Sequence, residues 1–273
     1  MSLRTRIAAL TELLEPDQDV LGLVLIGSFA ASDVKPDEWS DIDFVLVVGD
    51  AAFRRFYPET GWVARLGDPY AFSQSGNEFF GVTRVHLSDG RRVDFVIVPE
   101  SSLDRVGEWA SNPLRWQKQC LFSRSAALDR VLARTFPPYA PMPVSRDQIE
   151  RMANDLRFKG MLAVGKCARN ELLVALHLSL DMIRDCLVLA MMLRDRETGT
   201  DHHTDGSRGN QFVAELEDTR RPYTAEGILD SIERSAIAFD SLAARLVDGY
   251  EEGRGPLVKM VERARKGHST VGR

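Results

Sequence analysis

The stretch GSFAASDVKPDEWSDIDFVLVV, from Gly27 to Val48, carries the residues that decide the fold. Before it, Val20–Ile26 reads VLGLVLI, a nearly continuous apolar run of strand length that stops at the glycine. A second run of this kind, IDFVLVV, closes the stretch at Ile42–Val48. Short apolar runs bounded by Gly, Ser or Asp are typical of strands that are buried on both faces. The sequence therefore predicts two buried strands with a polar connection between them.

Two carboxylates open the second of these strands. Asp41 and Asp43 are separated by one residue, and alternate side chains of a strand point to the same face, so both carboxylates project together. Ionised carboxylates at a buried strand repel each other and lose hydration unless a positive charge lies between them. Mg²⁺ is commonly held by a few carboxylates, with its other positions left to water and phosphate. The pair therefore indicates a divalent cation, with Mg²⁺ as the natural choice.

A predicted β-hairpin supplies a third carboxylate. Phe80–Leu87 and Arg91–Val98 read as strands, and the Asp-Gly pair between them is a strong hairpin signal. Asp94 lies in the middle of the second strand, where an unpaired carboxylate would be costly to bury. We expect Asp94 to complete a three-carboxylate metal site with Asp41 and Asp43.

The end of the first strand suits a phosphate group. Gly27 allows close approach of the backbone, and a helix start after it would direct free N–H groups at an anion. Ser28 adds a hydroxyl donor. A triphosphate bound by Gly27 and Ser28, with a cation on the Asp pair, provides the parts needed for in-line phosphoryl or nucleotidyl transfer.

The rest of the chain suggests two domains. Four prolines between about residues 135 and 145 cannot continue a helix or a central strand, so this window is the best boundary. The first domain, residues 1–136, is expected to be α+β, with four strands in one sheet flanked by helices. The second, residues 145–273, is expected to be an all-helical bundle that begins with a capping box at Ser145 and Gln148.

One helix of this bundle has a clear apolar periodicity. Residues 170–194 place large apolar side chains three and four residues apart, which predicts the buried face of an amphipathic helix. These side chains are Leu173, Leu176, Leu180, Ile183, Leu187 and Met191.

Composition excludes several classes of function. The chain has 273 residues, of which 35 are Lys or Arg and 40 are Asp or Glu, giving a formal charge of −5. Such a chain lacks the positive field that binding to a nucleic-acid backbone needs. Apolar stretches stop well short of the roughly 20 residues of a membrane-spanning helix, and residues 1–18 do not read as a signal peptide. We expect a cytoplasmic protein with no nucleic-acid or membrane partner.

The order Gly27-Ser28, Asp41-x-Asp43 and Asp94 resembles the pattern of the nucleotidyltransferase superfamily typified by DNA polymerase beta. The strand SDIDFVLVV, the hairpin DGRRVDFVIVP and the helical second half resemble, within it, the bacterial streptomycin 6-adenylyltransferases. This resemblance implies a nucleotidyltransferase-fold mixed sheet in the first domain. It also implies transfer of AMP from ATP to a hydroxyl of an aminoglycoside, with release of pyrophosphate and with the three aspartates as catalytic metal ligands.

The resemblance further implies that the helical domain contributes to the reaction. In such enzymes this domain supplies a lysine to the triphosphate, a role that falls to Lys166 here, and often a carboxylate base to the acceptor. His177 stands about where the streptomycin family is expected to have an acidic residue. The base is therefore left open among several carboxylates: Asp94, Glu171, Asp181 and Asp185.

Alternative acceptors and functions stay open. The same chemistry could act on a lincosamide, another small metabolite or a protein side chain. A nucleotidyltransferase-fold protein could also bind a partner in a toxin–antitoxin pair, although such proteins are typically a single short domain. A homodimer is compatible with the resemblance, since two protomers can share an acceptor cleft in related enzymes.

Overall fold

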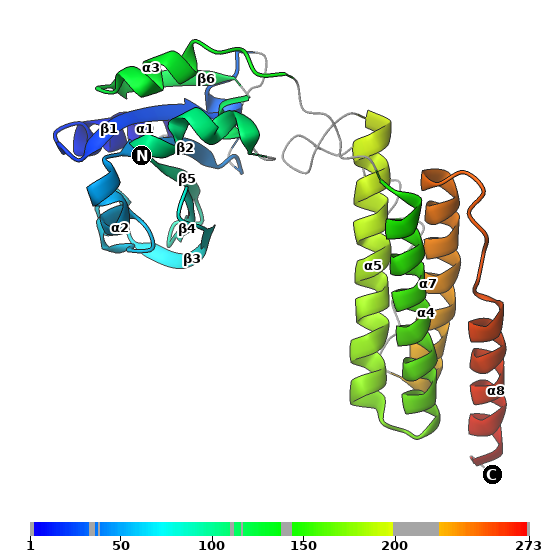
Figure 1. Ribbon diagram of the computed structural model, residues 1–273. Helices are drawn as coiled ribbons and strands as arrows, with labels where there is room; N and C mark the ends of the chain where they lie inside the picture. Colours follow the sequence, from blue (N-terminus) through cyan, green and yellow to red (C-terminus); the bar gives the residue numbers. More distant parts are fainter. Residues whose placement is uncertain are drawn as a thin grey trace. The chain divides into compact units, whose positions relative to one another are not determined.

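The computed structural model describes residues 3–32, 36–37, 39–109, 112–115, 117–137, 144–198 and 224–271. The chain forms two compact units, Met1–Pro138 and Tyr139–Arg273, each drawn in Figure 1. Of the proline-rich window expected to separate two domains, residues 138–143 lie outside the described part of the chain.

The first unit is built on a mixed six-stranded sheet (Figure 1). Its strand order is β3-β4-β5-β2-β1-β6, in which β2 and β5 are parallel and every other neighbouring pair is antiparallel. The α+β prediction is confirmed. The strands are β1 (Val20–Ile26), β2 (Ile42–Val48), β3 (Pro69–Gly76), β4 (Gly81–Leu87), β5 (Arg92–Pro99) and β6 (Lys118–Ser123).

Two strands of this sheet are missing from the sequence prediction, which expected four. The two apolar runs are β1 and β2 with the predicted bounds, and the predicted hairpin is β4 and β5. The missed strands, β3 and β6, are the two edges of the sheet. Almost every residue of β3 is exposed, so it has no apolar alternation by which a strand can be recognised.

One face of the sheet carries an aromatic core. The rings of Phe44 on β2 and Phe95 on β5 stack with centroids 5.4 Å apart, and Trp62 meets Phe95 edge-on at 4.9 Å. Apolar side chains from α1 (Leu3–Leu14) and α2 (Phe53–Phe56) pack against this core. Burial of Phe44 and Phe95 holds β2 and β5 side by side.

The opposite face has a second, mostly aliphatic core. Val24, Val45 and Val98 lie under side chains from the turns that follow β5 and from α3 (Ala126–Leu132). Both faces of β1, β2 and β5 are therefore covered along most of their length, which explains why their sequences read as continuous apolar runs.

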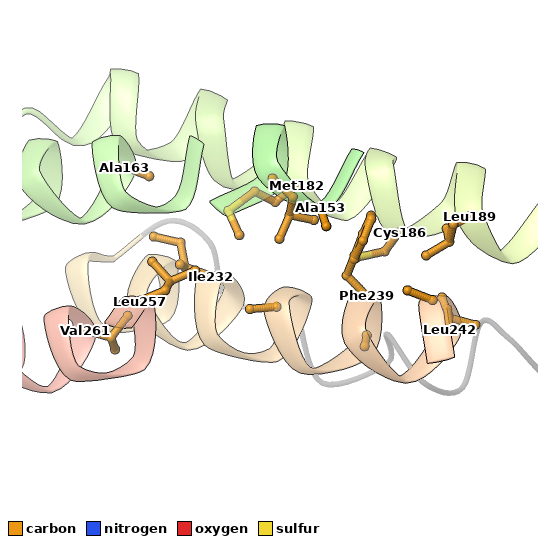
Figure 2. Packing of buried hydrophobic residues seen from close by; sticks show 14 of the residues in the cluster. Ala153, Ala163, Met182, Cys186, Leu189, Ile232, Phe239, Leu242, Leu257 and Val261 are labelled. Carbon is orange, nitrogen blue, oxygen red and sulfur yellow. The ribbon is translucent and has the colours of Figure 1, made fainter. Parts of the chain in front are cut away.

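The second unit is helical, as predicted. Figure 1 shows α4, α5 and α7 running side by side, and all three pack against one another. Figure 2 shows the core between them, where Cys186 of α5 lies beside Phe239 of α7, with Met182 and Leu189 on either side along α5. None of the described helices is long and apolar enough to cross a bilayer. The helices are α4 (Arg146–Ala168), α5 (Leu172–Thr198), α7 (Ala225–Leu246) and α8 (Gly255–Val271).

The buried face of α5 differs from the prediction. Leu173 is 82% exposed, and Leu180, Leu187 and Met191 are also exposed. Both sides of this helix are apolar, and the periodicity of the sequence favoured the side with the larger side chains. In the structure, close packing of three helices buries the other side, which has smaller side chains at several positions. The buried residues of this helix are Ala175, Ser179, Met182, Cys186, Leu189, Ala190, Leu193 and Arg194.

The predicted cap of the first bundle helix provides a stability test. The Ser145 hydroxyl accepts a hydrogen bond from the Gln148 backbone N–H at 3.1 Å, which satisfies one free donor at the start of α4. Ser145→Ala should lower the free energy of unfolding by about 1 kcal/mol, whereas Ser145→Asn should keep most of it, since Asn is also a good cap. Urea unfolding followed by circular dichroism tests this, and equal stability of both variants would contradict the capping role.

Candidate active site

The structure brings the three predicted carboxylates together. One oxygen from each of Asp41, Asp43 and Asp94 lies within 4.8 Å of the others. Asp94 is buried, whereas Asp41 and Asp43 are partly exposed at the end of the sheet. This is a compact, all-oxygen group of the type that hard divalent cations prefer.

Strand pairing explains why these residues meet. Asp43 on β2 lies directly opposite Asp94 on the parallel strand β5, and directly opposite Ile26 on β1. Residues opposite each other in neighbouring strands share a face of the sheet. Asp41 comes two residues before Asp43, just ahead of β2, and reaches the same side. The site therefore depends on the pairing of the two central strands.

Two arginines neutralise part of this charge. Arg92 donates to both oxygens of Asp94, with Nε to Oδ1 at 2.8 Å and Nη2 to Oδ2 at 2.6 Å. Its Nη2 is also 2.9 Å from Asp41 Oδ2. Arg84, opposite Asp94 on β4, places its Nε 3.3 Å from Asp94 Oδ2. Asp94 is thus held from two sides.

Asp43 is the most perturbed of the three carboxylates. Burial, followed by the charges of Asp41 and Asp94, raises the pKa of Asp43 to about 7, although Arg92 and Arg84 act in the opposite direction. Asp43 makes no ion pair with any side chain in the described part of the chain. A cation bound at this site would favour the ionised form of Asp43.

Gly27 closes one side of the site. Its φ of +71° is a left-handed conformation that glycine adopts readily. A Cβ atom at this position would lie 2.7 Å from Asp43 Oδ2, so the backbone here is as close to the carboxylate as a glycine allows. Gly27 is therefore required by both conformation and space.

Ser28 lies next to this contact, but the helix expected after it is only a single turn. Gly27–Phe29 forms one 3₁₀ turn, in which the N–H groups of Ala30 and Ala31 both donate to the Gly27 carbonyl at 3.1 Å. The expected helix start is thus a single 3₁₀ turn that ends at Phe29, not the first turn of a longer helix. Any phosphate here would be bound by the Gly27-Ser28 backbone and the Ser28 hydroxyl.

Lys166 and Glu171 belong to the second unit. Lys166 lies in the last turn of α4, and its Nζ is 2.5 Å from Glu171 Oε2. Glu171 also accepts from Arg169 at 2.7 Å. Hydrogen bonds from Lys166 and then Arg169 lower the pKa of Glu171 below its ordinary value, which makes this carboxylate a weak base.

The other candidate bases lie along α5. Asp185 pairs with Lys159 of α4 at 2.6 Å in a partly buried contact. Asp181 is partly exposed and makes no ion pair with the described residues, and His177 is exposed. The roles assigned to Lys166 and to these carboxylates stay predictions.

The two arginines are the site residues that sequence reasoning missed. Arg92 could have been found, because its spacing of two residues from Asp94 puts both side chains on one face of a strand. Arg84 comes from the neighbouring strand, and its contact depends on the register of the hairpin, which only the structure gives.

Comparison with known proteins identifies the family of the chain. Residues 4–211 match the sequence profile of streptomycin adenylyltransferase. The chain belongs to this family. It is accordingly a nucleotidyltransferase, which confirms the resemblance inferred from the glycine–serine and aspartate motifs.

Two solved structures of similar enzymes cover nearly the whole enzyme. An aminoglycoside 6-adenyltransferase from Bacillus subtilis is 14% identical, with a TM-score of 0.43, over 97% of this chain and 99% of that one. A spectinomycin adenyltransferase from Enterococcus faecialis, solved with ATP and spectinomycin, is 12% identical, with a TM-score of 0.33, over 98% and 100% of the two chains. No curated protein matches the enzyme.

Two glycine variants distinguish the effect of the close contact at Gly27 from the effect of its left-handed backbone. Gly90 also has a positive φ, of +84°, but no atom lies within 4 Å of the place where its Cβ would be. Gly27→Ala and Gly90→Ala should each lose about 1–2 kcal/mol of stability, because both force a side chain into the left-handed region. Only Gly27→Ala should also displace Asp43, and we expect its Mn²⁺ affinity, measured by electron paramagnetic resonance, to fall at least tenfold. Equal metal binding by the two variants would refute the contact.

The raised pKa of Asp43 predicts an unusual pH dependence. The folded metal-free enzyme holds a proton on Asp43 up to about pH 7, whereas the unfolded chain loses it near the ordinary carboxyl pKa of about 4. The folded state therefore binds more protons in this interval, so the free energy of unfolding should fall by a few kcal/mol between about pH 4 and pH 7. Asp43→Asn should remove this fall, as measured by urea unfolding in chelator.

Metal binding should show the opposite trend, because a cation binds the ionised carboxylate. Metal affinity should rise by about tenfold per pH unit up to about pH 7 and then level off. A flat profile in the wild-type enzyme would mean that Asp43 is already ionised without metal.

Proposed function

We propose that this enzyme transfers AMP from ATP to a hydroxyl of an aminoglycoside such as streptomycin, with Mg²⁺ and with release of pyrophosphate. The observation that carries this function is the convergence of Asp41, Asp43 and Asp94 within 4.8 Å, beside the close contact between Gly27 and Asp43. Membership of the streptomycin adenylyltransferase family supports both the transferred group and the class of acceptor.

The donor set suits the metal. Three carboxylates on or next to adjacent strands provide oxygen ligands only, and Mg²⁺ is usually bound by a few carboxylates together with water and phosphate oxygens. Asp41, Asp43 and Asp94 would hold Mg²⁺, which when bound would neutralise charge on the triphosphate.

The turn after β1 would bind the phosphates. Gly27 has no side chain to block the approach of an anion to its backbone, and the Ser28 hydroxyl can donate to a phosphate oxygen. From the second unit, Lys166 would pair with the triphosphate, which requires it to exchange its contact with Glu171 for a phosphate oxygen.

The transfer itself exchanges one phosphorus–oxygen bond for another. The acceptor hydroxyl oxygen forms a bond to the α-phosphorus, the bond from that phosphorus to the bridging oxygen breaks, and pyrophosphate leaves with the electron pair. The hydroxyl proton passes to a carboxylate base. Because the enzyme mainly positions the groups and neutralises their charge, the carboxylate site and the Gly27-Ser28 turn account for most of the chemistry.

The choice of base can be narrowed by the ion pairs. Asp94 has both oxygens bound by Arg92, so it is better suited as a metal ligand than as a proton acceptor. Glu171 and Asp185 are each paired with a lysine at 2.6 Å or less. Asp181, which has no ion pair among the described side chains, is the most available carboxylate of the four candidates.

The first experiment is an assay of pyrophosphate release with ATP and Mg²⁺ against a panel of acceptors that includes streptomycin, spectinomycin and a lincosamide. Asp41→Asn should lower release at least a hundredfold, because it removes a metal ligand. The exposed Asp37, four residues earlier, gives a matched control, and Asp37→Asn should keep wild-type turnover. Circular dichroism checks that both variants are folded.

The outcomes test the identity of the acceptor and the metal site separately. Release that depends on an aminoglycoside and disappears in Asp41→Asn would establish both. Release with only a lincosamide, another metabolite or a protein would refute the aminoglycoside and leave the nucleotide site in place. Wild-type turnover by Asp41→Asn would refute the metal site.

A further inference from the structure

Arg92 occupies a special position among the three carboxylates. It opens β5 and lies on the same face of the strand as Asp94, two residues later. Two hydrogen bonds, from Nε and Nη2, fix the plane of the Asp94 carboxylate. The same Nη2 also reaches Asp41 Oδ2 at 2.9 Å, so a single guanidinium bridges two of the three predicted metal ligands.

Through this bridge the Arg92 guanidinium neutralises the carboxylate charge that a bound metal would also neutralise. The side chains of Arg92 and Asp41 are 37% and 30% exposed, so their contact lies at the accessible side of the site. The Asp94 side chain is only 10% exposed and is also paired with Arg84. Arg92 can therefore give up its contact with Asp41 when another cation binds, whereas its contact with Asp94 is retained.

We propose that Arg92 is a positioning residue that keeps Asp94 oriented for the metal and releases Asp41 when the metal binds. This role rests on the proposed function, because the incoming cation is the catalytic metal. A carboxylate can accept about four hydrogen bonds or metal contacts, and Arg92 uses two of these on Asp94, while Arg84 lies 3.3 Å from Oδ2 in an ion pair. Acceptor capacity on Asp94 therefore remains for a metal, and the two hydrogen bonds from Arg92 fix the orientation of the carboxylate.

Two opposing effects follow from one side chain. A positive charge close to the site disfavours a second cation, so Arg92 weakens metal binding. The bidentate hydrogen bond from Arg92 holds Asp94 in the geometry that the reaction needs. Misplacement of such a group by about 1 Å can lower the rate roughly a hundredfold. Arg92 thus lowers metal affinity and raises turnover.

The test uses the full-length enzyme and three variants. Arg92→Met removes the charge and the hydrogen bonds, and Arg92→Lys keeps only the charge. Arg91→Met is the matched control, because Arg91 is the preceding residue and pairs with Asp89 in the hairpin turn. Mn²⁺ binding to the nucleotide-free enzyme is measured by electron paramagnetic resonance, and kcat is measured with the acceptor found in the pyrophosphate assay.

Arg92→Met should bind Mn²⁺ about tenfold more tightly than the wild-type enzyme, because one positive charge near the site can shift such an equilibrium by this much or more. Its kcat should fall about a hundredfold. Arg92→Lys should bind Mn²⁺ as the wild type does, with a reduced kcat, and Arg91→Met should match the wild type in both measurements. A residue needed only for folding would lower both quantities, so the split between affinity and rate is the signature.

Unchanged or weaker Mn²⁺ binding by Arg92→Met, together with wild-type binding by Arg91→Met, would overturn the role of Arg92. A wild-type enzyme that binds no Mn²⁺ at all would instead overturn the metal site of the proposed function, and the role of Arg92 with it.

Discussion

The repulsion among three carboxylates at the end of β2 and β5 is the constraint on which the rest of the site depends. Asp41, Asp43 and Asp94 converge within 4.8 Å, next to strands that are covered on both faces. Water cannot fully solvate them, so the protein must supply positive charge or leave a carboxylate protonated. It does both, since Arg92 and Arg84 hold Asp94 while the pKa of Asp43 rises to about 7.

The same arrangement of carboxylates lowers the stability of the fold. A hydrophobic pair in place of Asp43 and Asp94 would suit the aliphatic core on that face of the sheet better, yet the sheet keeps charged groups at this point. Such local costs are typical of functional sites and fit the proposed role of these aspartates as metal ligands. Packing of Phe44 against Phe95 on the other face of β2 and β5 offsets this cost and fixes the strand pairing that brings the aspartates together.

Much of this could be predicted from the sequence, because buried strands, and carboxylates placed within them, leave strong local signals. The bounds of β1 and β2, the hairpin and the meeting of the three aspartates followed from apolar runs and from the alternation of side chains. The exposed edge strand β3 and the buried face of α5 could not be predicted in this way. Exposed strands lack an apolar pattern, and a helix that is apolar on both sides does not reveal which side packs. The contact of Arg84 with Asp94 depends on strand register across a hairpin, which no short window of sequence determines.

Among the described residues, the buried apolar side chains form three cores, and the residues of each core belong to one of the two units. Two lie on opposite faces of the sheet, and the third lies among α4, α5, α7 and α8. The apolar surface buried within each unit contributes to the enthalpy and heat capacity of unfolding of the chain. A two-state analysis assumes one cooperative transition, so for a chain with more than one core it must be checked by comparing the calorimetric with the van't Hoff enthalpy.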